Sequence, residues 1–437
     1  MSDGLESGLD VIAESVLAGG GAASLAVAVT DRERTLAVRT HGVPEGTMFQ
    51  IGSIGKSFTA IVALQLAAAG ALDLHAPVTD ALPWFSVKGT ERPITLHHLL
   101  THSAGLIRGS ELATASNYDV IALADTAVGF QPGEHYWYSN VGYRAIGCAL
   151  ERVSGRAYPD LVRERILDPL GMRESESRIV PEMRPRLAQT HVPAYDDRPW
   201  RPEHGLVHGT WIDSAEADGC ICTSAADLAI YLRALMNRDE RLLDAAGWEA
   251  MLTPHVEDDE EGKGEHYGYG MDITKRGFSH GGAMIGTESM LAAEKDGLGA
   301  VAMAAGIVWA DVLTDAALAL ARGESPEPYA PKLDEPMRDD GSCPVEWRPF
   351  LGHYRSHIAW LTNFRVVGHE GGLQWGFDHL GTKRHPLTPL DDGSFRVGKD
   401  WSPERLSFDT VMDGVAQLAW LSGAPYYRSF RQDVPPP

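Results

Sequence analysis

The fold is decided by one stretch, Phe49-Gln50-Ile51-Gly52-Ser53-Ile54-Gly55-Lys56-Ser57-Phe58-Thr59-Ala60. The apolar run that follows Ser53 predicts a helix that begins at this serine. Residues three apart share a face of a helix, so Lys56 projects beside the Ser53 hydroxyl. A desolvated, neutral lysine amine can accept the serine proton, and a helix N-terminus favours negative charge where the serine attacks. The spacing is compatible with a serine nucleophile, but a Ser-x-x-Lys match on its own more often marks a solvent-facing pair, so further motifs are needed.

Two further polar motifs follow in the chain. The first is Tyr138-Ser139-Asn140, which lies within the segment Pro132–Tyr143. The second is His280-Gly281-Gly282-Ala283, which precedes a predicted hairpin.

With these motifs in this order, the chain resembles the penicillin-recognising serine hydrolases. This family includes class C β-lactamases, D-Ala-D-Ala carboxypeptidases, D-aminopeptidases and related esterases. Its signature is Ser-x-x-Lys, then Tyr-x-Asn or Ser-x-Asn, then Lys-Thr-Gly or a variant such as His-x-Gly. The likeness extends over residues 10–322 and includes the phrases Leu99–Leu106 and Asp168–Met172.

The resemblance implies roles for four side chains. Ser53 would be the nucleophile and Lys56 its proton partner. Tyr138 would be the phenol or phenolate that activates the serine and then protonates the leaving group. Asn140 would orient the lysine and hydrogen-bond the substrate amide.

The resemblance also implies how the third motif acts. The backbone N–H groups of Ser53 and Ala283 would form the oxyanion hole, and Gly281 and Gly282 would bind substrate along their strand. His280 replaces the lysine of the usual signature. We expect it to keep a hydrogen-bond donor toward the catalytic tyrosine and the substrate, without a fixed ammonium at neutral pH. The substitution favours esters, amides or D-amino-acid peptides over substrates that are held by a carboxylate.

Three neighbouring features are interpreted as structural. His102 is predicted to be a buried histidine in the floor of the site, and Glu134 a loop or cap carboxylate. Tyr267-Gly268-Tyr269-Gly270 is predicted to be a strand that enters the site, with glycines that allow close backbone approach and tyrosines that pack.

The first part of the chain predicts an α+β fold. Apolar runs at Ser24–Thr30 and Thr35–Thr40 form one predicted hairpin, and Ser289–Ala293 and Gly299–Ala304 form another. Strands at both ends of this part predict one antiparallel sheet flanked by helices, with an inserted helical subdomain. The predicted helices include Ser57–Ala69, Leu99–Leu100, Val141–Val153, Tyr158–Ile166 and Ala225–Met236.

A second domain is predicted at the C-terminal end. Four prolines between Pro326 and Pro336 indicate a stiff, extended linker. Short aromatic-rich runs separated by glycine turns follow, and they predict a small antiparallel barrel similar to lipocalin-like domains. The predicted units are residues 1–325 (the β-lactamase-like domain), 326–343 (the linker) and 344–437 (the barrel). Seven runs are predicted to be strands: His353–Arg355, Phe364–Val367, Leu373–Trp375, Phe395–Val397, Arg405–Phe408, Gln417–Trp420 and Tyr426–Phe430.

The composition limits the partners. The 437 residues carry a formal charge of −22, which disfavours nucleic acid and anionic membrane surfaces. No signal-like leader or apolar run long enough to span a membrane is evident, so the sequence predicts a cytoplasmic location. We expect no cofactor and no metal, and Cys220 and Cys222 are interpreted as small core side chains. The oligomeric state is not indicated.

The sequence therefore predicts a serine hydrolase that forms an acyl-enzyme on Ser53 with a small-molecule or peptide substrate. Within that class, a penicillin-binding-protein-type thioesterase that cyclises a carrier-bound peptide is an alternative. An alternative of another class is a catalytically silent binding protein of the same fold. Retention of Ser53, Lys56, Tyr138 and Asn140 together favours the enzyme.

Overall fold

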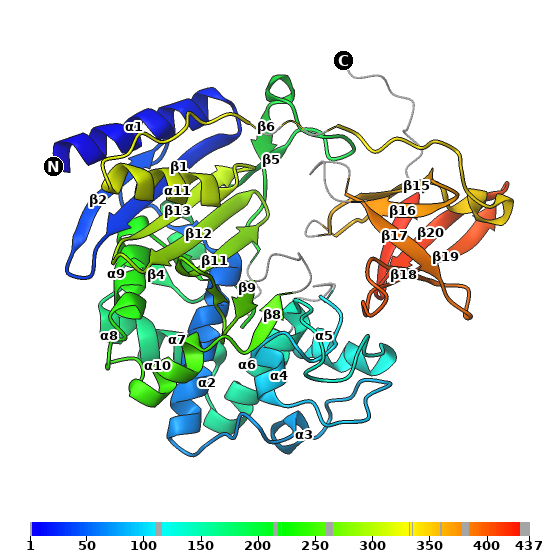
Figure 1. The fold of residues 1–437 in the computed structure, drawn as a ribbon, viewed down its shortest axis with the longest axis horizontal. Coiled ribbons are helices and arrows are strands. Elements are labelled where there is room, and N and C mark those ends of the chain that lie inside the picture. The colour runs from blue at the N-terminus through cyan, green and yellow to red at the C-terminus, as the bar shows by residue number, and fades with distance from the viewer. Residues whose placement is uncertain are drawn as a thin grey trace.

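The computed structural model describes residues 2–109, 116–212, 217–219, 221–258, 265–331, 333, 335–358, 361–377 and 384–428. It contains an eight-stranded antiparallel sheet with helices on both faces, which we call the sheet part, and a closed eight-stranded barrel beside it (Figure 1). The predicted α+β fold with a C-terminal barrel is thus confirmed.

The large sheet joins both ends of the sheet part. β1 (Ala22–Thr30) pairs on one side with β2 (Thr35–His41) and on the other with β13 (Gly299–Gly306). Both predicted hairpins are present, because β12 pairs with β13 as well. The sheet continues from β13 through β12 (Thr287–Glu294), β11 (Gly277–Met284), β10 (Asp272–Ile273), β9 (Glu265–Tyr267) and β8 (Val256–Asp258).

Two helices that the sequence analysis did not predict cover one face of the sheet. They are α1 (Ser2–Ala18) and α11 (Ala310–Ala321), which lie side by side in Figure 1. Their apolar side chains, such as Leu9 and Leu313, share a core with alternate residues of β1 and β13. These two helices cover this face of the sheet, whereas Ser53 and Lys56 belong to the segment that packs on the other face.

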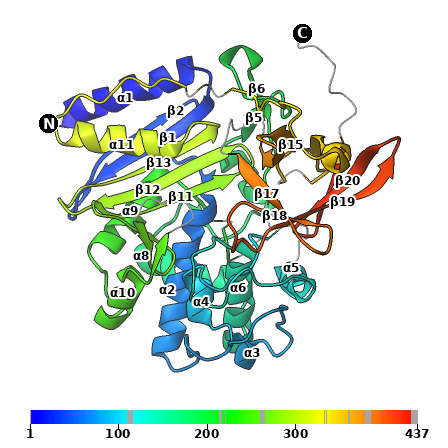
Figure 2. The same cartoon turned by 45° about the vertical axis from the view of Figure 1, so that its right-hand side comes forward.

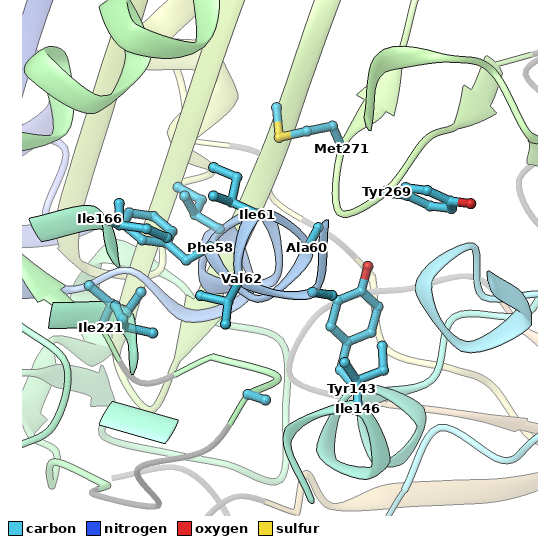
Figure 3. Close-up of a cluster of buried hydrophobic side chains, with 14 of the residues drawn as sticks. Phe58, Ala60, Ile61, Val62, Tyr143, Ile146, Ile166, Ile221, Tyr269 and Met271 are labelled. Atoms are coloured by element: carbon cyan, nitrogen blue, oxygen red, sulfur yellow. The ribbon is translucent and has the colours of Figure 1, made fainter. Parts of the chain in front are cut away.

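The other face is covered by helices that surround α2 (Gly55–Ala68). Every residue of α2 from Gly55 to Leu64 is buried, so this is a core helix rather than an amphipathic one. Figure 3 shows side chains of other elements around it, among them Tyr143, Ile166 and Met271. Its buried hydroxyls are paired, since Ser57 Oγ lies 2.7 Å from the Tyr231 hydroxyl of α9 (Ala225–Met236).

The remaining helices follow the predicted order with adjusted bounds. The residue before α9 is the predicted cap, because the Ser224 hydroxyl accepts a hydrogen bond from the Asp227 N–H at 3.2 Å. The predicted helix Tyr158–Ile166 is divided into α7 and a π-helical turn, Arg163–Leu167. These helices are α3 (Val78–Ala81), α4 (Leu96–Leu100), α5 (Ser116–Ala122), α6 (Asn140–Ser154), α7 (Tyr158–Val162), α8 (Asp168–Leu170), α9 (Ala225–Met236) and α10 (Ala245–Leu252).

Short strands complete the sheet part. Cys222, on β7, packs with Met48 and Leu187 as a small core side chain, whereas Cys220 lies outside the described residues. These strands are β3 (Phe49–Gln50), β4 (Ser175–Glu176), β5 (His191–Pro193), β6 (Leu206–His208) and β7 (Cys222–Thr223).

The barrel closes because its first strand pairs with its last. All seven predicted runs contain strands, although Ser429 and Phe430 lie outside the described residues. The analysis missed the fourth strand, which contains two prolines. The strands are β14 (Gly352–Arg355), β15 (Phe364–His369), β16 (Gly372–Gly376), β17 (His385–Pro389), β18 (Phe395–Val397), β19 (Arg405–Met412), β20 (Val415–Leu421) and β21 (Ala424–Arg428).

An extended segment connects the two parts. No helix or strand lies among the described residues between Gly323 and Pro344. The segment contacts the sheet part through an ion pair of Glu335 with Arg201, at 3.6 Å. In both views the barrel lies to one side of the sheet (Figure 1, Figure 2). None of the helices among the described residues combines the length and the apolar character needed to cross a membrane.

Candidate active site

Ser53 lies where the sequence analysis places it, at the start of the central helix. It is the middle residue of a 3₁₀ turn, Gly52–Ile54, that continues directly into α2. Ser53 is partly exposed, whereas its neighbours in the turn are buried. Lys56 is fully buried, and its Nζ lies 3.1 Å from Ser53 Oγ. The predicted pairing of the hydroxyl with the amine is present.

The Tyr-x-Asn motif reaches the same point from another helix. Its middle residue, Ser139, is the N-cap of α6, and the Ser139 hydroxyl accepts a hydrogen bond from the Gly142 N–H at 3.1 Å. Tyr138 therefore lies just before the helix, and Asn140 lies in its first turn. Asn140 Oδ1 lies 2.8 Å from Lys56 Nζ.

Lys56 contacts three oxygens at once. Besides Ser53 Oγ and Asn140 Oδ1, its Nζ lies 2.6 Å from the backbone carbonyl oxygen of Asp218. It also lies 4.8 Å from the centroid of the Tyr138 ring. A carbonyl oxygen can only accept, so Lys56 Nζ uses two of its N–H bonds to donate to the Asn140 and Asp218 oxygens. The third is directed at the serine.

Tyr138 is a protonated phenol at neutral pH. Burial raises its pKa well above the ordinary value for tyrosine, and a side-chain hydrogen bond with Ser53 opposes this only in part. Of the two forms expected for Tyr138, the environment favours the phenol, because the raised pKa keeps the proton on the hydroxyl.

The strand β11 approaches the serine turn through residues without side chains. A methyl group on Gly52 would lie 2.5 Å from the carbonyl oxygen of Ala283 and 2.7 Å from its nitrogen. A methyl group on Gly282 would overlap the carbonyl oxygen of Ile51. The Ser289 hydroxyl on β12 donates to that same carbonyl at 2.9 Å. Backbone contact thus places Ala283 beside the turn that carries Ser53.

His280 is buried on β11, but its partners differ from the expected ones. Its Nδ1 lies 2.5 Å from the carbonyl oxygen of Gly281, so this nitrogen carries the hydrogen. Its Nε2 then accepts from the Tyr267 hydroxyl at 2.9 Å. His280 therefore does not donate a hydrogen bond to Tyr138 in this structure, contrary to the expectation, since both of its ring nitrogens have other partners.

The charge expected of His280 agrees with its environment. Burial, followed by the charge of Lys56, lowers the pKa of His280 to about 4. The ring is neutral at physiological pH and supplies no positive charge for a substrate carboxylate.

The structural interpretation agrees with the positions of His102 and Glu134. His102 is buried, accepts a hydrogen bond from the Ser139 N–H at 3.0 Å, and packs against the Tyr138 ring with centroids 4.2 Å apart. Glu134 is exposed and pairs with Arg92 at 2.7 Å.

The interpretation of Tyr267–Gly270 needs a correction. The strand β9 ends at Tyr267, and Gly270 turns with φ +71° against the Lys56 carbonyl, where a methyl group would lie 2.6 Å away. The tyrosines do more than pack. Tyr267 donates to His280, and Tyr269 Oη lies 2.8 Å from His97 Nδ1.

The sequence analysis missed the groups behind Lys56. Asp218, whose carbonyl contacts the lysine, places its carboxylate 3.4 Å from Arg144 Nε, and Arg144 also pairs with Asp119. All three side chains are buried. No motif marks them, because they meet only through the packing of α6 against α5 and against the loop that contains Asp218. Among the residues that the structure describes, no group of three or more His, Cys, Asp or Glu side chains could hold a metal ion.

Comparison with known proteins identifies a family and several relatives of the chain. The family model described as Beta-lactamase matches residues 9–323. Penicillin-binding protein 4 of Amycolatopsis lactamdurans is 32% identical over 216 residues, which cover 48% of this chain and 55% of that protein. Esterase EstB of Burkholderia gladioli is 33% identical over 166 residues, or 33% and 42% of the two chains. The matched region thus spans about half the length of these relatives.

One solved structure matches almost the whole chain. The octameric penicillin-binding protein homologue from Pyrococcus abyssi superposes with a TM-score of 0.65 at 22% identity. The superposition covers 97% of this chain and 99% of that one, so the likeness of fold includes the barrel.

Proposed function

The chain belongs to the Beta-lactamase family, and on that premise we propose that this serine hydrolase forms a covalent acyl-enzyme on Ser53. The observation that carries the proposal is the set of three oxygens around Lys56 Nζ. A neutral amine donates its two N–H bonds to the Asn140 and Asp218 carbonyls, and its lone pair then points at the Ser53 hydroxyl.

In the first half-reaction, Lys56 accepts the Ser53 proton while Oγ bonds to the carbonyl carbon of the substrate. The backbone N–H groups of Ser53 and Ala283 stabilise the oxyanion that forms. Tyr138 donates its proton to the leaving oxygen or nitrogen and regains one from Lys56. The bond between the acyl carbon and the leaving group breaks, and the acyl group remains on the serine.

In the second half-reaction, water replaces the leaving group. The site delivers the water's proton to Ser53 Oγ as the new bond forms, and the released product is the acid. Asn140 keeps Lys56 directed at the serine in both steps and hydrogen-bonds the substrate amide, and Gly281 and Gly282 bind substrate along β11. His280 acts as a neutral group that orients Tyr267 at the edge of the site.

For the substrate, we propose small esters, amides or D-amino-acid peptides. The neutral His280 provides no fixed cation, so recognition need not involve a substrate carboxylate. The similarity to an esterase supports an ester as the first substrate to test.

The test of this proposal is covalent labelling. A fluorophosphonate probe should add one adduct per wild-type chain, detected by intact mass, and Ser53→Ala should gain none. Ser53→Ala should also lose turnover of p-nitrophenyl esters, with a melting temperature close to wild type, because one partly exposed hydroxyl contributes little to stability. Residual activity above about a thousandth of wild type would exclude Ser53 as the nucleophile.

A panel of substrates defines the acyl group. It consists of p-nitrophenyl esters, D- and L-aminoacyl p-nitroanilides and a chromogenic cephalosporin. Turnover of none of them, together with no fluorophosphonate adduct, would favour a silent binding protein instead.

We propose two further features of the whole chain. The division into 1–325, 326–343 and 344–437 is supported by the lack of helices and strands among the described residues of the middle segment. A cytoplasmic location remains the prediction made from the sequence.

A further inference from the structure

A loop of the barrel lies against the wall of the candidate active site. This loop connects β18 to β19. Its Trp401 ring stacks on His135 with centroids 4.6 Å apart and an angle of 2° between the planes. The same ring meets Trp137 edge-on at 5.6 Å. At Gly129, a methyl group would overlap the Trp401 carbonyl oxygen, so the two backbones are in direct contact.

The last residue of this loop is a buried carboxylate. Glu404 is 9% exposed, and its Oε1 accepts hydrogen bonds from the Arg108 N–H at 2.7 Å and the Trp137 Nε1–H at 3.2 Å. Its Oε2 accepts from the Ser422 hydroxyl, which belongs to the barrel. Hydrogen bonds to a carboxylate are stronger than those between neutral groups, so this is a firm contact between the two parts.

Both donors of the sheet part are next to proposed catalytic residues. Trp137 directly precedes Tyr138 in the chain. Arg108 uses its carbonyl oxygen to accept a hydrogen bond from the Asn140 N–H at 2.8 Å. The Glu404 carboxylate therefore binds the residue that precedes Tyr138 in the chain and the residue whose carbonyl accepts from the Asn140 N–H.

We propose that Glu404 is a positioning residue of the active site, through which the barrel fixes Tyr138 and Asn140. It touches neither Ser53 nor Lys56, and it acts by holding the backbone at Arg108 and the indole of Trp137. This inference rests on the proposed function, because it assumes that Tyr138 and Asn140 serve the acyl transfer. The barrel is then part of the catalytic geometry rather than an appended module.

The test compares full-length variants with an ester substrate. Glu404→Ala should lower kcat by about 10- to 100-fold with KM within about threefold of wild type, because a displacement of about 1 Å at a catalytic group can cost 100-fold. Glu404→Gln keeps an acceptor oxygen for the two N–H groups, so it should recover most of kcat. Trp137→Phe removes one of the two N–H donors to Glu404 and keeps an aromatic ring, so it should lower kcat by a smaller factor.

A matched control removes another contact between the two parts. Arg355 of the barrel pairs with Asp196 at an exposed position, and Arg355→Ala should leave kcat unchanged. A double variant, Glu404→Ala with Trp137→Phe, should fall little further than Glu404→Ala alone, because both changes remove the same contact.

Three results would overturn the inference. They are an unchanged kcat in Glu404→Ala, an equal loss in Arg355→Ala, or full additivity in the double variant. If Glu404→Ala does not fold, an unchanged kcat in Trp137→Phe overturns the inference on its own. Fluorophosphonate labelling of wild type separates this test from the first one. A labelled wild type with an unaffected Glu404→Ala contradicts only the role of Glu404, whereas an unlabelled wild type contradicts the proposed function.

Discussion

At the scale of single residues, the site combines a buried amine with a phenol and an imidazole that are both uncharged. Lys56 is fully buried and contacts three oxygens, while Tyr138 and His280 are neutral because burial shifts the pKa of each toward its uncharged form. As a neutral amine, Lys56 can accept the serine proton without a charge on the phenol or the imidazole beside it. The charged side chains of Arg144 and Asp218 lie behind it. This arrangement suits one proton that moves between serine, lysine and tyrosine.

Substitutions of Tyr138 and His280 should lower kcat by different factors. Tyr138→Phe should lower kcat by about 10²- to 10⁴-fold, the usual size of a general acid–base contribution. His280→Ala should cost less and change the preference among substrates. Tyr267→Phe is the matched control, because it removes a hydroxyl that contacts His280 rather than Ser53. Steady-state kinetics on one ester would decide, and equal losses in Tyr138→Phe and His280→Ala would show that the roles are assigned wrongly.

At the scale of elements, the proposed oxyanion hole depends on how closely β11 approaches the turn before α2. Gly282 faces the Ile51 carbonyl, whereas a methyl group on Gly281 would meet nothing closer than 3.8 Å. The two positions are adjacent on one strand. A comparison of their alanine variants therefore distinguishes a clash with the Ile51 carbonyl from a general effect of alanine on the sheet.

Gly282→Ala should therefore lower kcat strongly, because β11 must move away from the Ser53 turn to make room for the methyl group. We expect at least a tenfold loss, since small displacements at a catalytic group cost about 10- to 100-fold. Gly281→Ala should lower kcat by a much smaller factor, because its methyl group would meet only ordinary contacts. Thermal melts of both variants check that the fold is retained, and similar kcat values for the two would contradict the role of the close approach.

The elements also show what local sequence can and cannot predict. The serine and lysine are three residues apart, so helical periodicity alone places them together. Tyr138 and Asn140 join them from a distant helix, and only the resemblance to a family brought these residues into one site. β17 was missed because Pro386 and Pro389 each lack a backbone donor, which normally argues against a strand. Glu404 carries no local signal, because its partners lie in the other part of the chain.

At the scale of the whole molecule, buried histidines couple stability to pH. His280 in the sheet and His353 in the barrel are 4% and 2% exposed, and burial lowers the pKa of each to about 4. Unfolding returns them to an ordinary pKa near 6.5, so below that pH the unfolded chain binds more protons. Their stabilisation is complete above about pH 6.5 and is lost as the pH falls toward 4.

The melting temperature should therefore fall as the pH decreases from 7 to 5. Each histidine lowers the free energy of unfolding by at most about 3 kcal/mol between pH 7 and pH 4, since one pKa unit corresponds to about 1.4 kcal/mol. A double variant, His280→Gln with His353→Gln, should show a shallower decline in calorimetry. His208→Gln is the control, because His208 is exposed. An identical decline in the double variant and wild type would exclude these two residues as its source.

The pairing of β1 with β13 has a consequence for how the protein is made. The ribosome releases β1 and β2 early, but the partner of the other edge of β1 begins only at Gly299. Until then the nascent chain carries an unpaired strand edge with apolar residues such as Val27, a feature that promotes association between chains. Glu404 emerges later still, so the wall around Tyr138 acquires this carboxylate contact only after all strands of the large sheet have been synthesised.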